Sequence, residues 1–246
     1  NYVNNANLTF RAPAIILNSG ATVKTKNNTG DITFETKIPA AVAGGTPTIP
    51  DAGSITLNGA TVSGKNVKLS AIGGTSATIS LAGGSISGTN VAANASAVTN
   101  GGIGIKSSTA TVTVDGTTIT STGAAATDGV QLTAEAVTKA SLLSAFSSDD
   151  SPPSFQSMAL NTIANIQEMG FNPLGVTAVV GVARATANVE VKSGSTITST
   201  GDVTISAVSN TLVDMPHATQ AGTAKTLLPS IAVAYSEIDP HASAVV

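Results

Sequence analysis

Short runs in which apolar and polar residues alternate recur along the chain, and a glycine-containing turn follows each of them. The clearest runs, at residues 112–114 and 189–191, stand before two identical copies of the hexapeptide Thr-Ile-Thr-Ser-Thr-Gly, at residues 118–123 and 196–201. A further alternating run follows each copy. Such alternation predicts short half-buried strands. Because the whole pattern repeats, it predicts a protein built from stacked units.

Three more units follow the same order of strand, turn, short strand, turn and strand. They occupy residues 15–34, 55–69 and 79–92, so five units share one skeleton. The connections leave little room for helices. Parallel strands need a crossover connection, and here the other sides of a tube provide it. The sequence therefore predicts an all-β fold, a right-handed parallel β-helix (β-solenoid) in which each coil lies on the one before.

The alternation also predicts which side chains face the interior, because neighbouring strand residues point to opposite faces. We expect the outer members of each triplet to be inward (Val112, Val114, Val203, Ile205) and the middle members to face solvent (Thr113, Thr204). The Thr and Ser hydroxyls of the hexapeptide are expected on the outer wall. Polar residues before the strands are expected to cap turns: Asp31, Asn66, Asn90 and Asp202.

Some stretches depart from the repeat. Residues 141–175 form an insertion, and within it residues 154–170 predict a short α-helix, because Pro152 and Pro153 precede an apolar stripe that ends at Gly170. We expect this helix to pack on the solenoid flank. Residues 39–50 predict a loop, and residues 216–229 form a second excursion. The remainder reads as one solenoid segment over residues 1–246, which we expect to be a fragment of a longer chain.

Composition narrows the classes of function. Only 10% of the 246 residues are charged and 3% are aromatic, while 41% are hydrophobic, and the net charge is −3. A negative charge with few aromatics argues against nucleic-acid binding. The chain has no cysteine, which excludes disulfides and thiolate metal sites. No apolar run of about 18 residues predicts a membrane span, and no signal peptide is visible.

An enzymatic alternative can be weighed on the charged residues. β-Helices that process acidic polysaccharides need clustered carboxylates and a basic residue. The chain has two arginines, Arg11 and Arg184, which fall in different parts of the repeat. Its one adjacent acid pair, Asp149 and Asp150, lies in the insertion, where a solvated loop is expected. We therefore predict no catalytic residue and no enzymatic activity.

The two histidines lie in similar contexts. His217 follows Asp214, and His241 follows Asp239, each with a proline directly before the histidine. Two interpretations remain: the pair marks one turn position of the repeat, or the histidines and aspartates of neighbouring coils share a zinc or nickel ion. The first is preferred, so no metal and no cofactor are predicted, and His217 and His241 remain weak metal-site candidates.

The repeat resembles that of giant bacterial surface proteins related to filamentous haemagglutinins and autotransporter adhesins. Residues 176–191, 194–197 and 201–207 carry the likeness most clearly, and residues 7–13 with 30–34 resemble the same repeats. The resemblance covers most of the chain outside the insertion. It implies a secreted, cell-surface β-helix that serves as stalk, adhesin or filament, and it carries over no catalytic residues.

Together these features predict an extracellular structural or adhesive solenoid of a bacterial cell surface. The alternative is a carbohydrate-processing parallel β-helix, a polysaccharide lyase or glycosidase. Expected partners are neighbouring copies, or further repeats of the same chain, stacked end to end, because open β-helix ends expose unpaired backbone groups. Cell-surface glycans or proteins are further possible partners.

Overall fold

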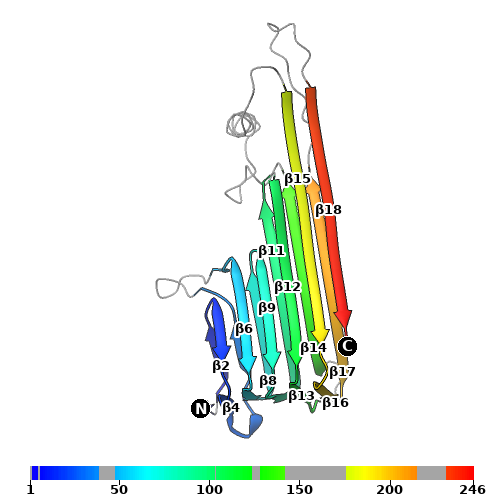
Figure 1. The fold of residues 1–246 in the computed structure, drawn as a ribbon. Coiled ribbons are helices and arrows are strands. Elements are labelled where there is room, and N and C mark those ends of the chain that lie inside the picture. Colours follow the sequence, from blue (N-terminus) through cyan, green and yellow to red (C-terminus); the bar gives the residue numbers. More distant parts are fainter. Residues whose placement is uncertain are drawn as a thin grey trace.

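In the computed structural model the chain winds through three parallel sheets in a fixed cyclic order. The structure describes residues 2–4, 6–38, 48–102, 104–123, 128–141, 176–214 and 231–246. Within them, six successive coils each contribute one strand to each sheet (Figure 1). All strand pairs between consecutive coils are parallel. The predicted parallel β-helix is confirmed.

The three sheets are named A, B and C in the order in which the chain enters them. Sheet A holds β1 (Tyr2–Asn4), β4 (Thr22–Thr25), β7 (Thr61–Ser63), β10 (Ser85–Gly88), β13 (Thr118–Ser121) and β16 (Thr196–Ser199). Sheet B holds β2 (Leu8–Arg11), β5 (Ile32–Glu35), β8 (Asn66–Gly73), β11 (Asn90–Gly101), β14 (Gly129–Ser141) and β17 (Asp202–Asp214). Sheet C holds β3 (Ala14–Leu17), β6 (Ala52–Asn58), β9 (Ser76–Ala82), β12 (Gly104–Asp115), β15 (Val176–Val191) and β18 (Ile231–Val245). A short 3-10 turn, η1 (Lys26–Asn28), follows β4.

The coils grow in one direction only. In sheet B the strands lengthen from 4 residues in β2 to 13 in β17, and in sheet C from 4 in β3 to 15 in β18. Sheet A stays short, with 4 residues in both β4 and β16. The tube therefore widens from the first coil to the last while its short side stays constant, which Figure 1 shows as arrows of increasing length.

The repeated hexapeptide explains how the coils keep their register. Its two copies form β13 and β16, which pair directly with Thr118 opposite Thr196 and Ile119 opposite Ile197. Ile119 is fully buried and is the apolar inward residue of that short strand. Val112 and Val114 are also fully buried, as predicted. Identical neighbours stack because a parallel ladder places equivalent positions of successive coils side by side.

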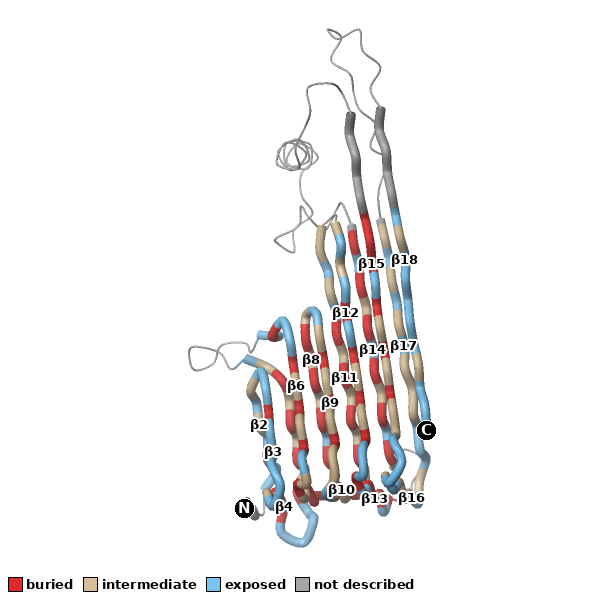
Figure 2. The backbone as a smooth tube through the Cα atoms, viewed as in Figure 1, coloured by how far each residue is buried: buried red, intermediate tan, exposed pale blue. Residues whose placement is uncertain are grey.

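The size of the inward side chains changes with distance from sheet A, and Figure 2 shows where buried residues alternate along the strands. Close to sheet A, inward positions carry large side chains such as Phe34, Leu69 and Leu132. Farther along the long strands they carry alanine, and sheets B and C face each other through a set of buried alanines: Ala95, Ala97, Ala110, Ala134, Ala136, Ala185 and Ala187. Alanine fills less depth between facing sheets than the larger side chains that space stacked sheets ~10 Å apart. Away from sheet A, sheets B and C therefore form a two-layered region with an alanine interior, which we call the blade.

A buried polar contact joins the two sheets in the blade. The Ser108 and Thr138 hydroxyl oxygens lie 2.6 Å apart, and Thr138 donates a hydrogen bond of 2.7 Å to the carbonyl oxygen of Arg184. Because that bond uses the Thr138 proton, Ser108 is the donor to Thr138. Both side chains are buried. This contact joins β12 and β15 of sheet C to β14 of sheet B where the interior has become too thin for a large apolar side chain.

The corner between sheets C and A needs glycine, as the sequence predicts. In successive coils this corner contains a glycine with φ between +60° and +83°: Gly20, Gly59, Gly83, Gly116 and Gly194. A side chain is strained at such φ values. The recurring glycine therefore lets the chain turn from the sheet C strand of each coil into the short sheet A strand that follows.

Val203 lies in the inward column, as predicted, and is 49% exposed because it belongs to the last described coil. One prediction about a single side chain is wrong. Ser121 is buried rather than on the outer wall, and its hydroxyl donates to the carbonyl oxygen of Thr89. The helix predicted in residues 154–170 lies outside the described residues, as do residues 215–230 and residues 39–47 of the predicted loop.

Candidate functional site

A ladder of Asn and Asp side chains runs along the corner between sheets A and B. Asn7 Oδ1 accepts a hydrogen bond of 2.9 Å from the backbone N–H of Asp31. The Asn66 amide donates to Asp31 Oδ1 at 2.7 Å, and the Asn90 amide donates to Asn66 Oδ1 at 3.0 Å. These residues occupy the same place, one before the first inward residue of each sheet B strand. The predicted turn caps are thus also bonds between coils.

Gly129 interrupts this ladder in the fifth coil. Its N–H donates to Asn90 Oδ1 at 2.9 Å, but glycine offers no side chain to the sixth coil, where Asp202 takes up the position again. A Cβ atom on Gly129 would lie 1.9 Å from the Asp202 carbonyl oxygen, and φ at Gly129 is +149°. Only glycine can therefore occupy this position of β14, which lies against the Asp202 backbone.

A pocket of about 200 Å³ lies at the interrupted rung. Its polar lining consists of Asn90, Asp128, Gln131, Asp202 and Thr204. The Asp202 N–H donates to the Asp128 carbonyl oxygen at 3.1 Å, which holds the two aspartates of neighbouring coils together. Two carboxylates with amide and hydroxyl groups offer acceptors and donors of the kind that sugar hydroxyls use.

The sequence analysis did not predict this pocket, although the sequence contains a signal for the pocket. Asn7, Asp31, Asn66, Asn90 and Asp202 share one repeat position, and Gly129 is the exception. Aligning the first residues of the sheet B strands would have revealed this exception. Asp128 could not have been placed, because residues 124–127 between the sheet A and sheet B strands of that coil obscure the repeat.

The predicted metal candidates are only partly described. His217 lies outside the described residues. His241 is exposed on β18, in register with Thr186 of β15, and Asp239 is exposed opposite Arg184. Among the described residues no group of three or more His, Asp or Glu side chains is placed to hold a metal ion.

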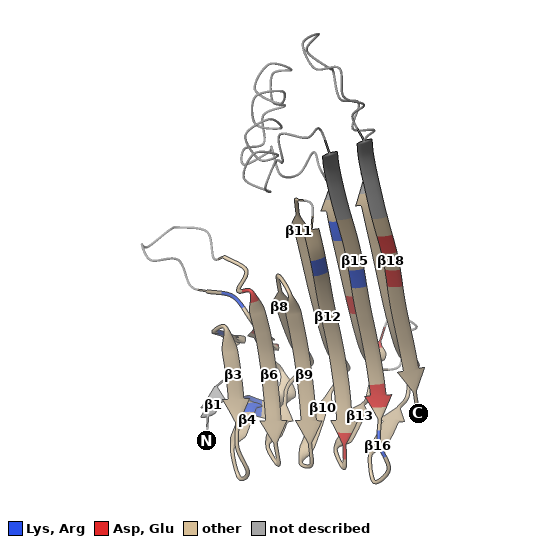
Figure 3. Cartoon of the chain, turned by 45° about the horizontal axis from the view of Figure 1, so that its top comes forward, with Lys and Arg blue, Asp and Glu red and all other residues tan. Residues whose placement is uncertain are grey.

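The two arginines lie far apart and each forms an ion pair. Arg184 on β15 pairs with Glu237 on β18 at 2.8 Å. Arg11 on β2 pairs with Glu35 on β5 at 3.0 Å. Figure 3 shows how sparse charged residues are along the described strands. Asp149 and Asp150 lie outside the described residues.

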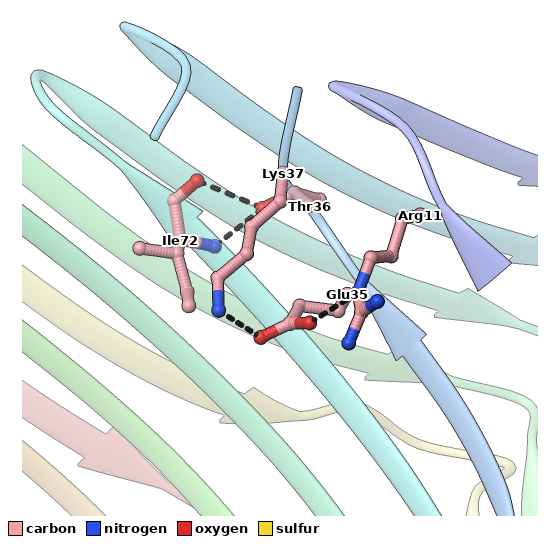
Figure 4. Close-up of polar contacts among 5 residues, drawn as sticks. All are labelled: Arg11, Glu35, Thr36, Lys37 and Ile72. Atoms are coloured by element: carbon pink, nitrogen blue, oxygen red, sulfur yellow. Dashed lines mark hydrogen bonds and ion pairs between the residues drawn. The ribbon is translucent and has the colours of Figure 1, made fainter. Parts of the chain in front are cut away.

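Glu35 also contacts a second cation, as Figure 4 shows. The Lys37 ammonium lies 2.6 Å from its second carboxylate oxygen. The hydrogen bond from Lys37, together with Arg11, lowers the pKa of the Glu35 carboxyl, although burial acts in the opposite direction. The neighbouring Thr36 is fully buried, donates to the Ile72 carbonyl oxygen at 2.8 Å and accepts from the Ile72 N–H. This cluster closes the far end of the short second coil against β8.

The first coil covers its own inward residues. Leu8 is 6% exposed and Ile15 is 8% exposed, although each lies in the terminal described coil. Phe10 stacks on Phe34 of the next coil with ring centroids 5.0 Å apart. We call this end, formed by β1, β2 and β3, the narrow end.

The last coil leaves its inward residues open. Val203 on β17 is 49% exposed and Ile238 on β18 is 54% exposed, whereas their partners one coil earlier, Val130 and Ala183, are 2% and 0% exposed. Figure 2 shows most of β18 as exposed. We call this end, formed by β16, β17 and β18, the wide end. It presents three strand edges and an uncovered row of core positions.

No family model, curated protein or solved structure matches this chain. In the part of the chain that the structure describes, no helix has the length and apolar character needed to cross a membrane.

Proposed function

We propose that this chain is a structural segment of an extracellular β-solenoid at a bacterial cell surface, serving as stalk, adhesin or filament. The observation that carries the proposal is the continuous parallel pairing of six coils through all three sheets, with inward residues stacked in columns from coil to coil. Each coil contacts only its neighbours, which builds an elongated body with a repetitive surface.

The bonding between coils supports a mechanical role. All three sheets run their strand pairing from coil to coil, and the Asn/Asp ladder adds side-chain bonds in the same direction. Among the described residues, no buried side-chain nitrogen or oxygen lacks a hydrogen-bond partner. Load along the tube would therefore be shared by many parallel hydrogen bonds, as a stalk requires. The likeness to repeats of bacterial surface proteins supports the extracellular location.

Electron microscopy and fibre diffraction of the native material test this proposal. Extended fibres or rods on the cell surface, with an axial spacing of about 4.8 Å from stacked coils, are the expected result. Compact particles inside the cell that lack this spacing would contradict it. Binding of the purified chain to cell-surface glycans or proteins would distinguish an adhesin from a passive stalk.

A carbohydrate-processing β-helix is the second candidate, and the pocket at Gly129 favours it. Two carboxylates, Asp128 and Asp202, line that pocket with donors and acceptors suited to sugars. Turnover of an acidic polysaccharide that is abolished by Asp128→Asn or Asp202→Asn would support this activity. Asp115→Asn is the matched control, since Asp115 is exposed and pairs with Lys192 away from the pocket. The pair Asp149→Asn and Asp150→Asn tests the insertion in the same assay.

A further inference from the structure

We propose that Lys106 prevents strand pairing between molecules at an open edge inside the solenoid, where the fourth coil extends past the third. The partner that Lys106 excludes is a second copy of this chain, which would pair through the same edge. This edge lies between two described coils, so it exists whatever coils precede or follow them. The role of Lys106 goes beyond the proposed function, because a stalk, an adhesin and an enzyme would all need it.

The fourth coil is longer than the third at the end away from sheet A. Strand β11 pairs with β8 only as far as Ala97, and β12 pairs with β9 only from Thr109 onward. Residues 98–101 and 104–108 therefore extend beyond the third coil, while β14 and β15 of the fifth coil pair with them on the other side. Figure 1 shows β11 and β12 reaching past β8 and β9. We call these two stretches the ledge.

The ledge presents backbone donors on its open side. The Thr109 N–H donates to the Thr75 carbonyl oxygen of the third coil at 2.9 Å. Because backbone groups of successive strand residues point alternately to the two neighbouring strands, the Ser107 and Ile105 N–H groups point to the same side, beyond the start of β9. Ile105 is 71% exposed and Ser107 is also exposed, so this edge is accessible. Such an edge is a template for pairing with another chain.

The step one coil earlier is shorter and is closed by a side chain. Strand β5 pairs with β8 only as far as Ser70, whereas β6 pairs with β9 from its first residue. Beyond Ser70, the fully buried Thr36 donates to the Ile72 carbonyl oxygen at 2.8 Å and accepts from the Ile72 N–H (Figure 4). One hydroxyl thus satisfies the edge groups of β8, but the ledge opens strands of two sheets and is too long for this solution.

Lys106 occupies an inward position of the ledge. It lies two residues before the buried Ser108, and its partner in the fifth coil, Ala183, is fully buried. A Cβ atom on Gly101 of β11 would lie 2.7 Å from Lys106 Cε and 2.9 Å from Nζ, so the lysine side chain crosses the blade toward β11. Among the described residues, Lys106 has no ion-pair partner.

An inward lysine makes this edge unsuitable for a further strand. A strand added to the ledge would cover the Lys106 ammonium group, and burying an unpaired charge is costly. Two ledges that met would also bring two ammonium groups together. Inward-pointing charges, and lysine in particular, are a means by which sheet edges avoid association. Alanine fills inward positions deeper in the blade, such as Ala110, so a small apolar residue would fit in place of Lys106.

Sedimentation and hydrogen exchange of the purified 246-residue chain test this role. Lys106→Val should strengthen self-association at least about tenfold, because it converts the ledge into an apolar edge. The amides of residues 104–108 should then become protected as concentration rises, whereas in the parent their exchange should not depend on concentration. Lys106→Ala should act in the same direction, and it matches Ala183 of the next coil, so the blade keeps its packing.

Lys139→Val is the matched control, since it removes the same charge from the chain. Lys139 is exposed on β14, which pairs with β11 on one side and β17 on the other, so its loss creates no apolar edge. Self-association should change by less than about threefold. Lys106→Glu retains an inward charge at the ledge and should behave as the parent does.

Several results would overturn the role of Lys106. They are unchanged association or unprotected ledge amides with Lys106→Val and Lys106→Ala, an equal increase with Lys139→Val, or association of Lys106→Glu. Stronger sedimentation without protection of residues 104–108 would place the contact elsewhere and would also count against the ledge. If Lys106→Val loses the cooperative unfolding of the parent, the alanine and glutamate variants decide the outcome.

Discussion

The two ends of this solenoid are built from the same repeat and reach opposite outcomes. The narrow end keeps Leu8 and Ile15 buried with only four residues in each of β2 and β3, and Phe10 and Phe34 fill its interior. The wide end has 13 and 15 residues in the equivalent strands but leaves Val203 and Ile238 half exposed. Length of strand therefore does not decide whether a terminal coil is covered.

The size of the inward side chains also differs between the two parts of the solenoid. Near the first coils the inward residues are large, as Phe34 is. Where sheets B and C meet through alanine, each added strand pair buries little apolar area, since the hydrophobic gain scales with area at roughly 25 cal/mol per Å². The wide end thus depends on pairing between strands, and the narrow end on side-chain packing.

The largest expected effect tests packing between the narrow end and the second coil. Phe34→Ala removes a fully buried ring that stacks on Phe10, and it should lower the free energy of unfolding by about 3–5 kcal/mol. Urea denaturation measures the loss. Ile205→Ala at the wide end is the comparison, since Ile205 is only partly buried. It should cost about 1 kcal/mol, and equal losses at both positions would contradict the contrast between the ends.

The next effect tests the passage between the fifth and sixth coils. Gly129→Ala forces a Cβ against the Asp202 backbone at a φ of +149°, so the last coil must shift away from β14. We expect a loss of about 2–4 kcal/mol and faster amide exchange in β17 than in β11. Gly194→Ala is the control, because φ there is +83° but no atom lies closer than 3.8 Å to the added carbon. It should cost about 1 kcal/mol.

Much of this architecture could be predicted from the sequence, but the lengthening of the strands from the first coil to the last could not. Five units were assigned correctly because Val and Ile at inward positions alternate visibly with Thr and Ser. The long strands β14 and β15 extend well past those triplets, through Ala134, Ala136, Ala185 and Ala187. Alanine occurs in loops, in helices and in thin interiors. Alternating alanine therefore does not by itself predict a buried strand. Burial of Ser121 was likewise invisible, because its acceptor, the Thr89 carbonyl, belongs to the preceding coil.

A smaller effect tests the polar contact that closes the blade. Ser108→Ala leaves Thr138 without its donor in a buried site, and we expect a loss of about 1–3 kcal/mol in the free energy of unfolding. Thr138→Val alone should cost a similar amount, since it leaves the Arg184 carbonyl and the Ser108 hydroxyl unbonded. If the contact acts as one unit, a double-mutant cycle from denaturation will show the pair of changes to be less costly than their sum.

The smallest effect is the pH dependence that the ion cluster adds at the narrow end. Lys37 and Arg11 lower the pKa of Glu35 in the folded chain, so its contribution to stability is present above the unfolded pKa near 4.5 and is lost as pH falls through the lower folded value. Because Arg11 is half exposed, we expect about 0.5 kcal/mol. Comparing Glu35→Gln with the parent by denaturation at neutral and acid pH should show stabilities that converge at acid pH. If the difference in unfolding free energy between Glu35→Gln and the parent widened on acidification, the cluster would close the narrow end through Thr36 and Ile72 alone.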